Sequence, residues 1–242
     1  MSQVILYPLL ITLGFAPSIF WLIFYLKKDL HPEPKAMLTR VFFMGLVLAF
    51  LAVVSQWILS RVILSFNANI EIGSYKLFFL GAAFIEETVK FLAVKFIVLN
   101  NPEFDEPLDA MIYMITASLG FAAIENILVL FQTIPNGVVG TASIWFYRFV
   151  GATFLHALSA AVTGYFLSLA WFYHRHSRKL IFLGLILATI VHFIFNSILL
   201  SSSLQAQAFA RSSIFLGTVG IFISVLFANL RKKELRDKTK LG

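Results

Sequence analysis

Three ionisable side chains lie close together within one long apolar run of the sequence. Glu86, Glu87 and Lys90 fall inside residues 82–92, where nearly every other residue is apolar. A helix of this composition would carry them to the middle of a bilayer, where insertion scales assign about 2.5–3.5 kcal/mol to each ionised side chain. Lys90 follows Glu86 by four residues, which places the two on one helical face and predicts that they pair. Metal binding, trapped water or a changed protonation state must then account for the remaining carboxylates.

Later apolar runs contain further polar residues, namely Glu125, His156, His192 and Asn196. At a rise of about 1.5 Å per residue, both histidines lie some 18–21 Å from the nearer starts of their expected helices, close to mid-bilayer. Glu125 lies nearer the outer end of its expected helix. Because intramembrane helices usually associate through Ser, Thr, Asn or Gln, this set of ionisable groups predicts a functional site rather than a packing feature.

Two kinds of hydrolytic chemistry suit these residues. Two histidines and a carboxylate form a ligand set of hydrolytic zinc, and a separate glutamate can then accept a proton from water. Without a metal, a Glu–His pair can activate water while a second histidine and Asn196 stabilise the oxyanion. The sequence lacks the soluble zinc-protease pattern of two histidines around a glutamate, so separate helices must assemble the site. The zinc-dependent and metal-free mechanisms both remain open.

The elements that position these residues are expected to be membrane-spanning helices. The chain is 60% hydrophobic and 13% charged, whereas soluble domains carry about a quarter charged residues, so a soluble globule is excluded. We predict an all-α, polytopic transmembrane bundle that forms a single domain over residues 1–242. It should have about seven spans, at roughly 4–26, 38–65, 75–99, 107–132, 142–173, 180–200 and 211–230. The absence of cysteine excludes disulfides and thiolate nucleophiles.

Basic residues predict the orientation of the bundle. They cluster after the first and fifth expected spans and in the C-terminal tail, and the alternate loops hold almost none. The positive-inside rule therefore places the N-terminus outside and the C-terminus in the cytoplasm, with the first apolar run retained as a helix. The formal charge of +7 is distributed in these flanking clusters. We therefore expect a lipid bilayer as partner and no nucleic acid.

Four ordered motifs of the chain resemble those of the PrsW family of bacterial intramembrane proteases, relatives of the CAAX prenyl-protease and bacteriocin-processing group. They are a double glutamate followed by lysine (Glu86, Glu87, Lys90), a phenylalanine-to-glutamate motif ending at Glu125, and histidine motifs at His156 and at His192 with Asn196. The resemblance implies an intramembrane endopeptidase of the bacterial cytoplasmic membrane. It also implies that the substrate is a single-pass membrane protein, typically a membrane-tethered anti-sigma factor.

The resemblance also suggests a role for each residue. Glu86 would be the general base, although Glu87 is almost as good a candidate, and Glu87 and Lys90 would orient it. His156 and His192, with Glu125 as a further candidate, would hold zinc or water. Asn196 would stabilise the oxyanion.

Two other classes of protein fit some of the same residues. A proton or ion transporter also uses intramembrane Glu, Lys and His, although here these residues cluster at one depth instead of forming a ladder. A non-catalytic membrane scaffold could retain a protease-like site, since a subunit of gamma-secretase is thought to share this ancestry. Retention of both glutamates and both histidines favours the peptidase.

Overall fold

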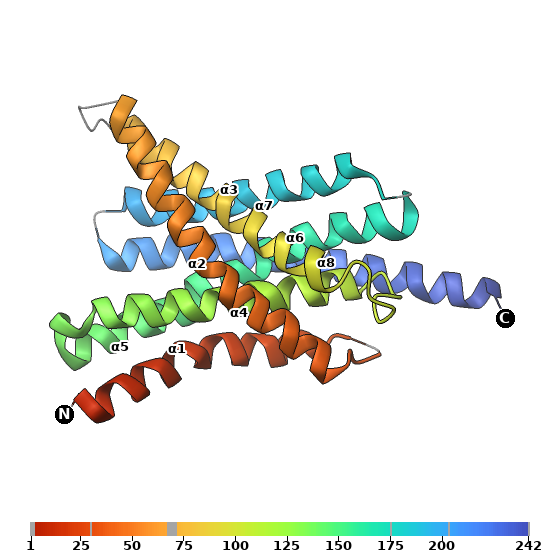
Figure 1. Cartoon of the computed structure of the whole chain (residues 1–242), viewed down its shortest axis with the longest axis horizontal. Helices are drawn as coiled ribbons and strands as arrows, with labels where there is room; N and C mark the ends of the chain where they lie inside the picture. The colour runs from red at the N-terminus through yellow and green to blue at the C-terminus, as the bar shows by residue number, and fades with distance from the viewer. Residues whose placement is uncertain (1–2, 30, 67–71, 175, 203, 242) are drawn as a thin grey trace.

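The computed structural model describes residues 3–29, 31–66, 72–174, 176–202 and 204–241 of the chain. All regular elements in these residues are helical, as Figure 1 shows. They are α1 (Gln3–Leu26), α2 (Lys35–Phe66), α3 (Ile72–Ile97), α4 (Asp109–Gln132), η1 (Ile134–Asn136), α5 (Gly137–Tyr147), η2 (Arg148–Ala152), α6 (Thr153–Ser168), η3 (Leu169–Tyr173), α7 (Arg178–Ser201) and α8 (Gln205–Leu241).

The predicted all-α membrane bundle is confirmed. Among the described residues, six helical stretches are long and apolar enough to cross a membrane, and they correspond to six of the expected spans. The expected span 75–99 corresponds to α3, which is equally long but does not qualify by composition. The reason is its five charged residues, Lys76, Glu86, Glu87, Lys90 and Lys95. This helix therefore depends on its neighbours to remain in the apolar layer.

Two expected spans differ from the structure in extent. The span expected at 142–173 begins earlier, since an apolar helical path runs from Ile134 to Tyr173. It contains two π-helical segments, Arg148–Ala152 and Leu169–Tyr173. The span expected at 211–230 is longer, because α8 continues from Gln205 to Leu241. Its flanking residues are mostly Ala, Gln, Lys, Arg, Glu and Leu, good helix formers that hydropathy alone does not recognise.

Helix α4 lies at the centre of the bundle, in contact with α1, α2 and α6. Glycines bring the backbones of α2 and α4 together. A Cβ atom at Gly45 would lie 1.9 Å from the Ala117 carbonyl oxygen, and one at Gly120 would lie 2.0 Å from that of Phe42. Because neither position tolerates a side chain, the crossing of α2 and α4 is fixed by backbone contact.

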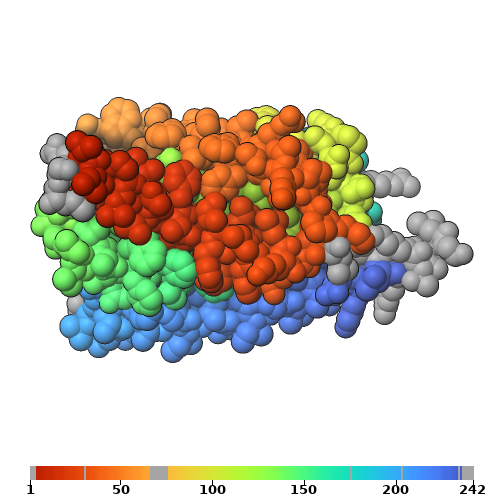
Figure 2. All heavy atoms as spheres, turned by 90° about the horizontal axis from the view of Figure 1, so that it is seen from below, coloured from red at the N-terminus to blue at the C-terminus, as the bar shows by residue number. Residues whose placement is uncertain are grey.

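The outer surface is apolar, as a lipid-facing surface must be. Large side chains such as Phe50 and Trp57 of α2 and Ile221 and Phe222 of α8 are exposed. Figure 2 shows α1 and α2 covering much of one face, with α8 along its edge. The two ends of the chain lie at opposite ends of the bundle (Figure 1). This arrangement fits an odd number of crossings, while the predicted orientation stays a prediction.

Candidate active site

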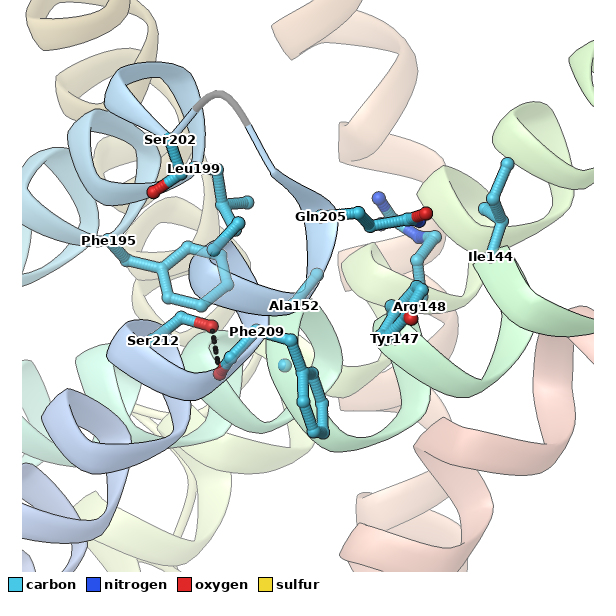
Figure 3. A pocket seen from close by; sticks show the side chains of 12 residues that line it. Ile144, Tyr147, Arg148, Ala152, Phe195, Leu199, Ser202, Gln205, Phe209 and Ser212 are labelled. Atoms are coloured by element: carbon cyan, nitrogen blue, oxygen red, sulfur yellow. Dashed lines mark hydrogen bonds between the residues drawn. The ribbon is translucent and has the colours of Figure 1, made fainter.

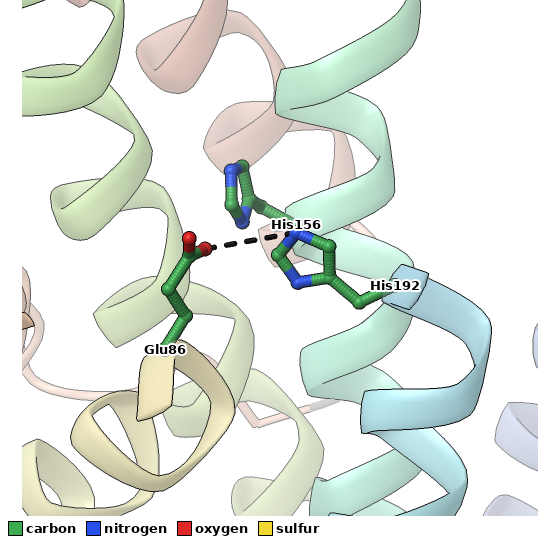
Figure 4. Close-up of side chains that lie close together, drawn as sticks. All are labelled: Glu86, His156 and His192. Atoms are coloured by element: carbon green, nitrogen blue, oxygen red, sulfur yellow. Dashed lines mark ion pairs between the residues drawn. The ribbon is translucent and has the colours of Figure 1, made fainter. Parts of the chain in front are cut away.

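Side chains from α3, α4, α6 and α7 meet inside the bundle. Figure 4 shows Glu86 of α3, His156 of α6 and His192 of α7 directed toward one another. All three are buried, and one potential metal-ligating atom from each lies within 4.8 Å of the others. The rings of His156 and His192 are 5.2 Å apart and nearly perpendicular. The fold thus brings together groups that are far apart in the sequence.

Glu87 is the structural centre of this cluster. Its Oε1 accepts hydrogen bonds from Lys90 Nζ at 2.8 Å, Ser159 Oγ at 3.0 Å and His192 Nδ1 at 2.8 Å. The predicted pairing of Lys90 with Glu86 is present, with Lys90 Nζ 3.9 Å from Glu86 Oε2, but the contact of Lys90 with Glu87 is closer. The α3 backbone brings the Lys90 side chain closer to the carboxylate three residues before it than to the one four residues before it.

Glu86 and His192 each present an atom without a hydrogen bond. His192 Nδ1 lies 2.8 Å from Glu87 Oε1, so in the neutral ring the lone pair is on Nε2, and this atom is 3.6 Å from Glu86 Oε2. Gln56 Nε2 donates to Glu86 Oε1 at 2.8 Å, while the buried Oε2 has no hydrogen-bond partner among the described residues. A carboxylate that fixes the far nitrogen of an imidazole is the usual arrangement behind a metal-ligating histidine.

His156 is held at both ring nitrogens. Lys90 Nζ lies 2.7 Å from its Nδ1, and Glu125 Oε2 lies 2.8 Å from its Nε2. An ammonium group can only donate, so Nδ1 accepts and Nε2–H donates to Glu125. Phe121 lies beside the ring, with centroids 5.7 Å apart. The ring of His156 is therefore fixed in its orientation by a cation, a carboxylate and an aromatic neighbour.

Sequence reasoning missed the cation that pairs with Glu125. Arg148 Nη2 donates to Glu125 Oε2 at 3.0 Å, and its Nε donates to Asn126 Oδ1 at 2.6 Å. Asn126 in turn donates to Thr153 Oγ1 at 3.0 Å. The available signal was the expected cost of an unpaired Glu125, which calls for a cation inside a neighbouring span. Gln56 and Ser159 were also missed, because uncharged polar residues are ordinary helix contacts.

Asn196 is the one candidate residue that the structure leaves outside this hydrogen-bonded cluster. It lies on α7 one turn beyond His192 and is half-buried. Its side chain makes no hydrogen bond within the described part of the chain. Its role in stabilising an oxyanion stays a prediction.

Comparison of the sequence with known proteins shows the family of this chain. The sequence model of the "PrsW family intramembrane metalloprotease" matches residues 33–228. The chain belongs to the PrsW family. It is 33% identical over 193 residues to "Protease PrsW" of Geobacillus kaustophilus, covering 79% of this chain and 80% of that protein. It is 34% identical over 196 residues to "Protease PrsW" of Bacillus subtilis, covering 80% and 84%. No solved structure matches the chain.

Membership of the PrsW family supports the peptidase among the classes considered from the sequence. The chain is an intramembrane peptidase and an integral membrane protein of the bacterial cytoplasmic membrane. The six apolar helical stretches are long enough to cross the membrane that the family description implies.

The buried donors fit the metal that the family description of PrsW proteases implies. Glu86, His156 and His192 supply one carboxylate and two imidazoles, a set typical of hydrolytic zinc. Glu86 Oε2 and His192 Nε2 are free to bind an ion. His156 would first have to release Lys90 or Glu125, because both of its nitrogens are engaged.

Proposed function

We propose that this chain cleaves a peptide bond of a membrane-anchored protein, with Glu86 as the carboxylate that acts on the attacking water. The observation that carries this proposal is the approach of Glu86 Oε2 to His192 Nε2, 3.6 Å apart in a buried cluster of ionisable groups. Glu87 is the weaker candidate for this role, because three donors, one of them the Lys90 ammonium, engage its Oε1, whereas Glu86 Oε1 accepts one hydrogen bond; Oε2 has no hydrogen-bond partner among the described residues in either glutamate.

Each remaining group has a role that follows from its contacts. Glu86 accepts a proton from water as the water oxygen attacks the scissile carbonyl carbon, and the proton passes to the leaving nitrogen when the C–N bond breaks. Glu87 keeps His192 Nε2 directed at the reacting atoms. Arg148 and Glu125 keep His156 in place. Asn196 lies one turn from His192 and is proposed as a donor to the oxyanion.

With zinc bound, His156 and His192 would hold the ion and Glu86 would remain beside it as the base; the zinc would supply a Lewis acid that makes water more acidic. By resemblance, the substrate is a single-pass membrane protein such as an anti-sigma factor. A substrate of this kind would reach the site laterally from the lipid, because the site residues lie within helices of the bundle, on α3, α4, α6 and α7.

The proposal is tested by co-expressing the chain with tagged single-pass membrane proteins. Wild type should cleave at least one, and Glu86→Gln, His156→Ala and His192→Ala should each lower the rate by about 10²-fold or more. Glu103→Gln, which changes an exposed loop glutamate, is the matched control and should cleave normally. Unchanged cleavage in all three site variants would refute the assignment.

A second arm of the experiment concerns the metal. If zinc takes part, a chelator should abolish cleavage by the purified protein, and added zinc should restore it. Cleavage that persists in chelator, with no zinc in the purified protein, would instead support a mechanism in which Glu86 and a histidine activate water alone.

A further inference from the structure

A cavity of about 460 Å³ lies beside the catalytic cluster, between η2, α7 and the start of α8. Figure 3 shows the side chains around it, which include Arg148, Phe195, Leu199, Ser202, Gln205 and Phe209. This volume falls within the range of about 300–1,000 Å³ that is usual for ligand-binding sites. Nothing in the proposed chemistry uses the cavity directly.

Arg148 connects the cavity to the catalytic groups. The Nε and Nη2 atoms of its guanidinium donate to Asn126 and Glu125, and Glu125 in turn contacts His156. The Glu125 side chain is 30% exposed, whereas that of Glu86 is 8% exposed and that of Glu87 fully buried. The cluster is therefore most open on the side where Arg148 lies.

The lining of the cavity provides both kinds of hydrogen-bonding group. A guanidinium has five N–H donors, and Arg148 uses two of them on partners in the described part of the chain. Gln205 is exposed and contributes an amide. Ser202 and Ser212 donate to carbonyls of their own helices, so their oxygens remain available as acceptors. Phe195, Leu199 and Phe209 supply apolar surface between these groups.

From this combination we infer that the cavity binds an extended segment of the substrate polypeptide next to the scissile bond. A transmembrane helix must unwind before one of its peptide bonds can be attacked, and each freed N–H and C=O then needs a partner away from water. Arg148 and Gln205 can donate to freed carbonyls, and the serine oxygens can accept from freed N–H groups.

Two features favour a peptide over the other occupants of such a cavity. A lipid acyl chain has no hydrogen-bonding groups, so these donors and acceptors would be left unpaired against it. An acidic group is not required either, because Glu125 already compensates the charge of Arg148. Neutral main-chain carbonyls are the acceptors that match the remaining N–H groups.

The segment η2 gives the cavity its position. It is π-helical over Arg148–Ala152, and such segments occur frequently at functional sites. Gly151, within it, faces the Phe195 ring across the cavity lining, and a Cβ atom there would be in ordinary contact with the ring, 3.5 Å from its nearest carbon.

The test blocks the cavity and measures cleavage kinetics. The inference rests on the proposed function, so the assay uses a tagged single-pass membrane protein that wild type cleaves. Gln205→Trp should fill the cavity and raise KM about tenfold with kcat little changed. Gln207→Trp is the matched control, because Gln207 is exposed on the same helix but does not line the cavity. Its KM should equal that of wild type.

A second variant and a second readout guard against misfolding. Ser202→Trp should raise KM in the same way. A photoreactive phenylalanine at position 205 of the Glu86→Gln protein should crosslink to the substrate. The same group at position 207 should not. Equal KM values for Gln205→Trp, Ser202→Trp and Gln207→Trp would overturn the inference while leaving the proposed function intact. The inference would also be overturned if a phospholipid co-purified with wild type but not with Gln205→Trp, and the two proteins had the same KM. If wild type cleaves no membrane protein, both proposals fail.

Discussion

Glu86 and Glu87 are neighbours in the sequence, yet their surroundings in the bundle differ. Glu87 is completely buried and accepts three hydrogen bonds at Oε1, one of them from the ammonium group of Lys90. Glu86 accepts one hydrogen bond, from Gln56, and Oε2 of both glutamates has no hydrogen-bond partner in the described structure. The difference therefore lies at Oε1, where Glu87 is held by three donors and Glu86 by one, and it favours Glu86 as the proposed base.

This difference predicts different consequences for the same substitution. Glu87→Gln leaves the Lys90 ammonium buried without its closest counter-charge, and breaking a buried pair typically costs about 3–5 kcal/mol. We expect a large fall in thermal stability in detergent together with loss of activity. Glu86→Gln should lose activity while unfolding within a few degrees of wild type. Equal destabilisation by the two variants would contradict this division of roles.

The sequence was sufficient to select the ionisable residues of the buried cluster but not to predict all of their contacts. Glu86, Glu87, Lys90, Glu125, His156 and His192 could be selected because ionisable groups inside apolar helices are costly. Lys90 was expected to pair with Glu86, and it does, but its closer contact with Glu87 could not be assigned, because both glutamates are within reach along one helix and side-chain packing decides between them. Arg148 contacts Glu125 across two helices, and sequence spacing contains no information about such a contact.

At the scale of helices, the crossing of α2 and α4 is the most constrained contact. Gly45→Ala would place a Cβ atom 1.9 Å from the Ala117 carbonyl oxygen, so the helices would have to separate. Overpacking of this kind costs about 1–3 kcal/mol, and we expect a lower melting temperature and reduced activity.

Gly217→Ala is the matched control, since nothing lies within 4 Å of its Cβ position on α8. It should be neutral or slightly stabilising, because alanine favours helices. Thermal unfolding in detergent would distinguish the two, and equal melting temperatures would argue against the tight crossing.

The loop between α1 and α2 is attached to α4 through Glu33. The Tyr113 hydroxyl donates to Glu33 Oε2, and the Glu33 carboxyl also contacts Asp109. Burial raises the pKa of Glu33 above its ordinary value of 4.5, with Asp29 and Asp105 acting in the same direction and the two hydrogen bonds opposing it. A raised pKa in the folded state means that the neutral form stabilises the fold. This contribution is complete below the unfolded pKa and is lost as the pH rises through the folded pKa.

Glu33→Gln keeps an acceptor for Tyr113 and cannot ionise. We therefore expect it to melt at a higher temperature than wild type at about pH 8 and at the same temperature at about pH 4. Glu103→Gln, in the exposed loop before α4, is the matched control for replacing a glutamate by glutamine. A constant offset between Glu33→Gln and wild type at both pH values would show that ionisation of Glu33 is not the cause.

Hydropathy was a good guide to helices and a poor guide to their internal geometry. Apolar length alone gave the existence of each long helix, because the bilayer leaves few alternatives for the backbone. The π segments η2 and η3 were not predicted, since an extra residue in one turn depends on packing against other helices. The ends of α8 were also missed, because helix continues there through polar residues.

At the scale of the whole molecule, orientation in the membrane is open to a direct experiment. The chain has no cysteine, so each introduced cysteine is a unique label. Asn136→Cys, between α4 and α5, should react with an impermeant maleimide added to intact cells. His174→Cys, in the basic loop before α7, should react only after the membrane is opened. The reverse pattern would overturn the predicted orientation.

The charges of α3 also have a consequence for how the protein is made. Five charged residues make this helix a poor substrate for insertion by itself. Its buried ions are satisfied by Ser159 and His156 of α6 and by His192 of α7, which leave the ribosome later. Stable residence of α3 in the bilayer therefore awaits synthesis of the second half of the chain. A nascent chain that stalls before α7 should remain incompletely integrated and be a target for quality-control proteolysis.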